Sequence, residues 1–225
     1  NPDKTWCSAA VLSLLNACTP EEHRYYKDYR PSDLQSFTNV LDQDQWARRL
    51  LPKEMDQTVT SIFSIIQNVI FASKGQPLSR YGLDLSQAID VTQSQYTATA
   101  FVNFAAGTLG LTPPPFFFLQ SAGPGFQVLE TAPPVLVSDG NEQGFTDRVA
   151  TAFVLGQQLS LFYPGLFVSQ MASSGTEMLS WLLASIRMFV PTLPVPDNMA
   201  GQISDKLAPL RSSLDDFTME RLQGH

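Results

Sequence analysis

The sequence predicts an α+β fold that is mostly helical, with a small, mainly antiparallel sheet and a helical hairpin at the N-terminus. Apolar residues at positions 55, 59, 62, 66 and 69 recur at helical spacing. Three prolines at 113–115 end another helical run and force the chain to extend. Short apolar runs then follow up to position 138, interrupted by a Gly-Pro-Gly turn at 123–125. Helices around one small sheet satisfy this pattern.

The N-terminal hairpin is predicted from two helical segments, 6–17 and 20–29. Thr19 is expected to cap the second helix, and Pro20 suits its first position, where the missing N–H has no partner to lose. Glu21 and Glu22 favour the positive end of the helix dipole. Arg30 and Pro31 then end it, so residues 1–31 form one predicted unit and residues 32–225 another.

The remaining elements follow from periodicity and from helix-ending residues. Residues 32–52 predict one or two short helices, and Gly75 and Pro77 end the helix that starts at 55. Residues 78–90 resemble a loop, and Thr92 or Ser94 is expected to cap a helix that ends at Leu109. Strands are expected at 116–119 and, within the region 126–137, as two separate runs that start at 126 and 135. Further helices are expected near 149–162, 176–190, 199–207 and 212–223.

Composition and charge narrow the function classes. The 225 residues carry a net charge of −7 with no Lys/Arg cluster, so nucleic acid is excluded as an expected partner. No apolar run is long enough to predict a membrane span. Cys7 and Cys18 are eleven residues apart in the first predicted hairpin, too far for a disulfide along a continuous helix. Both are expected to be reduced, which indicates a cytoplasmic location.

Residues 153–162, FVLGQQLSLF, have the spacing of a zinc-protease helix without its zinc-binding groups. In the HExxH motif two histidines one turn apart bind zinc, and the glutamate between them is the general base. The corresponding residues here are Gln157, Gln158 and Leu161. An amide is a poor zinc ligand and cannot act as a base, and a leucine side chain cannot bind metal. No metal, no cofactor and no catalytic residue are predicted.

The segments before this helix strengthen the similarity. LGLTPPPFFFL, the Gly-Pro-Gly turn, residues 126–130 and residues 135–138 follow one another as in gluzincin metallopeptidases of the CAAX-protease type, which residues 96–164 resemble. The resemblance implies a sheet packed on a zincin-like helix that directs residues 157, 158 and 161 inward. It also implies that Glu177 occupies the place of the third zinc ligand, but an acid in the first turn of a helix, stabilised by the helix dipole, is the preferred interpretation. The alternative for residues 153–162 is an ordinary buried amphipathic helix, in which apolar residues recur at helical spacing: Val149, Phe153, Leu155, Leu159 and Phe162.

The hairpin has a resemblance of its own. WCSAAVLSLL followed by PEEHRYYKDYRP resembles a terminal tetratricopeptide repeat, which implies further repeats of the same chain as packing partners. The whole arrangement is similar to bacterial repeat proteins that end in a degenerate metallopeptidase-like domain.

These observations predict a non-catalytic protein-interaction or scaffold domain, a pseudo-metallopeptidase that binds a protein or peptide partner. A free strand edge could accept the partner as an added strand. The residues expected there are Phe116, Phe117, Phe118, Val135 and Val137. In the alternative, the chain's own loops cover this edge. The alternative function is a hydrolase with an unrecognised non-zinc active site between the sheet and the helix near Met178.

Overall fold

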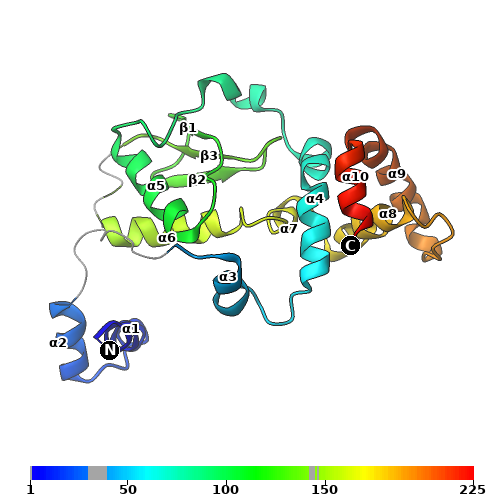
Figure 1. The fold of residues 1–225 in the computed structure, drawn as a ribbon. Helices are drawn as coiled ribbons and strands as arrows, with labels where there is room; N and C mark the ends of the chain where they lie inside the picture. The colour runs from blue at the N-terminus through cyan, green and yellow to red at the C-terminus, as the bar shows by residue number, and fades with distance from the viewer. Residues whose placement is uncertain (1, 30–39, 142–144, 146) are drawn as a thin grey trace.

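The computed structural model describes residues 2–29, 40–141, 145 and 147–225, and it has the predicted mostly helical α+β fold (Figure 1). The sheet lies between α5 and α6 on one side and the segment 78–88 on the other, whereas α4 and α7–α10 form a separate helical layer. The helices are α1 (Pro2–Leu14), α2 (Pro20–Asp28), α3 (Gln43–Arg49), α4 (Gln57–Lys74), α5 (Thr97–Leu109), α6 (Arg148–Ser160), α7 (Val168–Met171), α8 (Gly175–Arg187), α9 (Asp197–Ser213) and α10 (Asp216–Gln223). The strands are β1 (Phe116–Phe118), β2 (Phe126–Leu129) and β3 (Val135–Ser138).

The N-terminal hairpin forms as predicted, with α1 packed against α2. Thr19 caps α2 in a capping box with Glu22, whose carboxylate accepts from the Thr19 N–H at 2.8 Å. α1 ends at Leu14, three residues earlier than predicted, and Asn16 then takes a left-handed conformation with φ of 54°. The predicted end at Arg30 and Pro31, and any helix within 32–39, lie outside the described residues.

α5 begins at Thr97, and the predicted caps are not used. Tyr96 is the N-cap residue and makes no side-chain cap hydrogen bond. Thr92 is held in the preceding turn, where its hydroxyl donates to Asp90 at 2.6 Å. α5 starts five residues after Thr92, too far along the chain for this side chain to reach the first N–H groups of the helix.

The sheet is mixed, with strand order β1-β3-β2. β2 pairs antiparallel with β3, but β1 pairs parallel with it, so one of the two pairings is antiparallel. β3 is therefore the central strand. The two strands predicted at 126–130 and 135–138 form as β2 and β3, and residues 130–134 turn the chain back between them.

Both faces of the sheet are buried. Phe116 and Leu136 contribute to a core with α5 and α6, which includes Leu155 and Leu159. Strand side chains alternate between faces, so Phe117, Val135 and Val137 contribute to a second, smaller core under the segment 78–88. The predicted packing of the sheet on α6 is thus confirmed.

The helical layer has the largest core, built from α4, α7, α8, α9 and α10. α9 is longer than predicted because it continues through Pro209 to Ser213. The segment between α6 and α7 joins this layer to the sheet, and the Gly165 N–H donates to the side chain of Gln67 on α4 at 3.2 Å.

Candidate functional site

Helix α6 carries Gln157 and Gln158, two of the three positions compared with the zinc-protease motif, and Leu161 follows its last residue. Asp147 caps the helix at the Ala150 N–H, and Ala152, Leu155 and Leu159 are buried. Phe153, which the buried-helix alternative places in the core, is 65% exposed. α6 therefore buries only a narrow stripe of its surface, and the residues at the three motif positions differ in their surroundings.

Among Gln157, Gln158 and Leu161, only Gln158 has a described side-chain hydrogen bond to the sheet. Its Nε2 donates to the backbone oxygen of Phe126 on β2 at 3.1 Å. Its Oε1 is buried and has no partner among the described residues. The side chain in the general-base position therefore ties α6 to the edge strand β2.

Gln157 and Leu161 do not join Gln158 in a common site. Gln157 is exposed to solvent, so the expectation that all three positions face inward is wrong for this residue. Leu161 follows the last helical residue and is partly buried against the core of the helical layer. Residues four apart share a helix face, but α6 ends at Ser160, which separates the surroundings of these two side chains.

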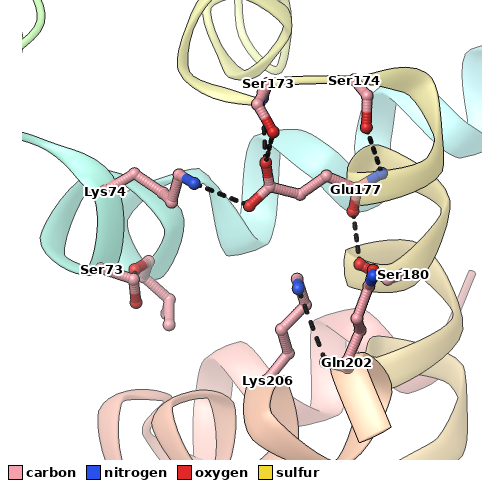
Figure 2. A network of polar contacts seen from close by, with 9 residues as sticks. Ser73, Lys74, Ser173, Ser174, Glu177, Ser180, Gln202 and Lys206 are labelled. Atoms are coloured by element: carbon pink, nitrogen blue, oxygen red, sulfur yellow. Dashed lines mark hydrogen bonds and ion pairs between the residues drawn. The ribbon is translucent and has the colours of Figure 1, made fainter. Parts of the chain in front are cut away.

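Glu177 lies in the first turn of α8, where Figure 2 shows its carboxylate between Lys74 and Ser173. Oε1 is 2.8 Å from Lys74 Nζ at the end of α4. Oε2 accepts from the Ser173 N–H at 2.9 Å and from the Ser173 hydroxyl at 2.7 Å. Burial opposes ionisation of the carboxyl, but these partners outweigh it and lower the pKa of Glu177 from 4.5 to about 2. Glu177 is an ionised structural residue that joins α4 to α8.

The predicted peptide-docking edge needs a correction. Val135 and Val137 belong to the central strand and are fully buried, so they offer no edge. β1 is an edge strand, but Phe116 and Phe117 are buried. The Phe116 oxygen also accepts from the Ile89 N–H at 2.8 Å, so the chain's own segment 89–91 covers part of this edge. Only Phe118 keeps partial exposure.

A groove that the sequence reasoning missed lies between α3 and the first half of α4, and we name it the α3–α4 groove. Its volume is about 810 Å³. Hydroxyl and amide groups line it together with apolar side chains, and its charged lining residues are Asp42, Asp44 and Lys53. The lining of the α4 side and of the facing segments includes Gln57, Thr60, Ser61, Ser64, Leu111, Thr112, Phe162 and Tyr163.

Trp46 fixes the α3 wall of this groove. Its side chain is 3% exposed, and its Nε1 donates to the Leu109 oxygen at 2.7 Å. Its ring also lies 4.6 Å from that of Tyr163. Asp42 starts α3 with a capping box, accepting from the Gln45 N–H at 2.8 Å. A buried tryptophan within a polar stretch was the signal in the sequence that α3 is anchored to the domain.

Two glycines bring the other walls close together. A Cβ on Gly165 would lie 2.5 Å from the Thr60 oxygen, and a Cβ on Gly110 would lie 2.3 Å from the Leu41 oxygen. Both glycines have positive φ, 85° and 66°, which other residues rarely adopt. The shape of the groove is therefore set by backbone contacts that larger residues would break.

Comparisons with protein families, characterised proteins and solved structures find no match for this chain. Within the described ranges, no three His, Cys, Asp or Glu side chains gather as a metal site would require. In the same part of the chain, no helix is both long enough and apolar enough to cross a bilayer.

Proposed function

We propose that this chain is a non-catalytic protein-interaction domain and that a segment of a partner polypeptide docks in the α3–α4 groove. The observation that carries the proposal is the groove itself, a preformed concavity of about 810 Å³ with both polar and apolar lining. Hydroxyl and amide groups can bond the backbone of a bound segment, and Phe162 and Leu111 offer apolar contacts for its side chains.

One side of α4 contributes part of the polar lining of the groove. Thr60, Ser61 and Ser64 lie one turn or less apart, on the side of α4 opposite to buried residues such as Ile66. Thr60 and Ser64 direct their hydroxyl hydrogens to backbone oxygens, Thr60 to Asp56 at 2.9 Å and Ser64 to Ser61 at 2.8 Å. Their oxygen lone pairs can accept hydrogen bonds from a ligand.

The ancestry of the domain is a separate part of the proposal. Amides and an aliphatic residue occupy the positions of zinc ligands and base, and the amide in the base position bonds Phe126. A pseudo-metallopeptidase origin accounts for this spacing, but peptide docking in the groove does not depend on it.

The N-terminal hairpin supports an interaction role as well. Val11, Leu15 and Tyr29 are 56%, 67% and 62% exposed. Tetratricopeptide-like hairpins bury such side chains against neighbouring repeats. We therefore propose that further repeats of the same kind cover this apolar surface.

The alternative function is a hydrolase. The sequence predicts its site between the sheet and the helix near Met178, whereas the serines that line the α3–α4 groove are Ser61 and Ser64 on α4. The charged side chains that line the groove are Asp42, Asp44 and Lys53. Asp42 accepts the Gln45 N–H and Asp44 pairs with Arg48 at 3.3 Å, so both carboxylates have structural partners. Labelling of Ser61 or Ser64 by a fluorophosphonate probe would favour this alternative, because such labelling needs an activated hydroxyl.

Peptide selection tests the proposed function. A random linear peptide library is selected against the wild-type chain, and the recovered peptides are titrated by calorimetry. Ser61→Arg places a long charged side chain in the groove, and we expect it to weaken binding at least about tenfold. Asn68→Arg is the matched control, because Asn68 is an exposed residue of the same helix outside the groove. Peptides that bind both variants equally, or an empty selection, would contradict the proposal.

A further inference from the structure

The chain between α8 and α9 carries three prolines within six residues, PTLPVP at 191–196. A proline ring fixes its own φ at roughly −65°, and it also restricts the residue before it to extended backbone. Each of the four residues 193–196 is either a proline or the residue before one. The sequence therefore limits the whole segment 193–196 to extended conformations before any tertiary contact forms.

The structure has the conformation that this pattern dictates. Residues 193–196 lie between helices, and Pro196 has φ of −60° and ψ of 135°. These are the angles of a polyproline II helix. At the start of the segment, the Leu193 N–H donates to the Val190 oxygen at 3.0 Å and closes a turn. At its end, Pro196 is the N-cap residue of α9, so both ends of the segment are fixed.

The side chains of the segment alternate between the core and the solvent. Val195 packs against the core of the helical layer, and Leu193 is half-buried. Pro194 and Pro196 are exposed. The two aliphatic side chains thus hold the segment on the domain, and the two proline rings remain accessible at the edge of the helical layer, away from the sheet (Figure 1).

The backbone of this segment offers hydrogen-bond acceptors and few donors. Pro194 and Pro196 have no N–H, and the Leu193 N–H is used in the turn. Within the described part of the chain, no hydrogen bond is donated to the oxygens of residues 193, 194 and 195. A strand partner needs donors and acceptors in alternation, so this segment cannot extend a sheet. It suits a partner that supplies donors.

We propose that residues 193–196 are a docking segment for a polyproline-binding protein, whose aromatic-lined groove receives the two exposed rings. Proline-rich segments in this conformation dock in grooves lined by aromatic side chains, and indole N–H and phenol O–H groups of such a groove can donate to the three free oxygens. Because the segment is already extended, little conformational entropy is lost on binding. Val190, which is 46% exposed just before the segment, adds an aliphatic contact.

The segment is short, so the interface is small. Two rings, one valine and four residues of backbone bury less than about 1,200 Å² in total, which is the range of weak and transient interfaces. We expect a dissociation constant of roughly 1–100 µM. In the alternative, the prolines only stiffen the connection between α8 and α9, and their substitution changes the stability of the domain without changing any binding.

Calorimetric titration of the full chain against a panel of purified polyproline-binding domains, of the SH3 and WW classes, tests the proposal. At least one domain is expected to bind wild type with a dissociation constant below about 100 µM, and that domain's own proline-rich peptide should displace the chain. Pro194→Ala removes an exposed ring, and we expect it to weaken this binding at least about tenfold.

Pro124→Ala is the matched control, because Pro124 is an exposed proline of another turn, outside the segment, and it should leave the affinity unchanged. Circular dichroism verifies that both variants are folded. No binding by any domain of the panel up to about 500 µM, equal affinity of Pro194→Ala and wild type, or an equal loss in Pro124→Ala would each overturn the proposal. Ser61→Arg in the α3–α4 groove should still bind the domain, so this test is independent of the peptide-binding one.

Discussion

Gln158 on α6 donates a hydrogen bond from its side-chain amide to the backbone oxygen of Phe126 on β2, at 3.1 Å. A glutamate in this position could not make the bond, because an ionised carboxylate has no proton to donate. The side chain in the general-base position of the zinc-protease frame thus has a structural task that requires an amide. We therefore expect the stability of the domain to depend on the amide of Gln158.

Gln158→Glu tests this relationship. It brings a carboxylate to the Phe126 oxygen in a buried place, and we expect the free energy of unfolding to fall by about 2–4 kcal/mol. Gln157→Glu is the matched control on the exposed side of the same helix and should change stability by less than about 0.5 kcal/mol. Chemical denaturation measures both. Equal effects of the two variants would show that the Phe126 contact is unimportant.

Gly165→Ala tests the close contact behind the α3–α4 groove. Its Cβ would lie 2.5 Å from the Thr60 oxygen at a φ of 85°, so we expect a loss of at least about 2 kcal/mol in the free energy of unfolding. Gly201→Ala on α9 meets nothing within 4 Å and should stabilise the protein by about 0.5–1 kcal/mol. A Gly165→Ala variant as stable as wild type would mean that the 161–167 segment does not press on α4.

Trp46→Phe tests how α3 is anchored. Phenylalanine keeps a ring beside Tyr163 but cannot donate to the Leu109 oxygen, as the Trp46 Nε1 does at 2.7 Å. We expect a loss of about 1–3 kcal/mol, because a partly buried carbonyl loses its partner. Binding of a selected peptide should weaken with it. Unchanged stability together with unchanged peptide affinity would show that the Trp46 hydrogen bond does not hold the α3 wall of the groove in place.

The lowered pKa of Glu177 predicts how the free energy of unfolding changes in acid. Its pKa in the folded protein is about 2, below its ordinary value of 4.5, so the ionised carboxylate stabilises the fold above pH 4.5. This contribution is lost as the pH falls from about 4.5 towards 2. The difference in unfolding free energy between wild type and Glu177→Gln should therefore shrink over this window, and Lys74→Met should lessen the change. A difference that is independent of pH would contradict the Lys74–Glu177 pairing.

The sequence pointed to most of the fold because its signals are local. The Thr19 cap, the α4 periodicity and the end of α5 at Leu109 depend on neighbours within one or two turns, and each was predicted. Whether β1 pairs parallel or antiparallel with β3 depends on how the chain between them is routed, which short-range patterns do not encode.

The candidate site was harder to predict for the same reason. Helical spacing places Gln157 and Leu161 on one face, but only the tertiary packing reveals that α6 ends between them. The groove combines α3, α4 and two distant segments, and its shape depends on where Gly110 and Gly165 meet backbone oxygens.

Amide chemical-shift mapping of the wild-type chain with a peptide recovered from the selection tests the central claim most directly. We predict the largest shifts at Thr60, Ser64, Leu111 and Tyr163, which line the groove on three different segments. The same residues in Ser61→Arg should show little change. Shifts concentrated on β1 or on α6, with the groove residues unaffected, would contradict docking in the α3–α4 groove.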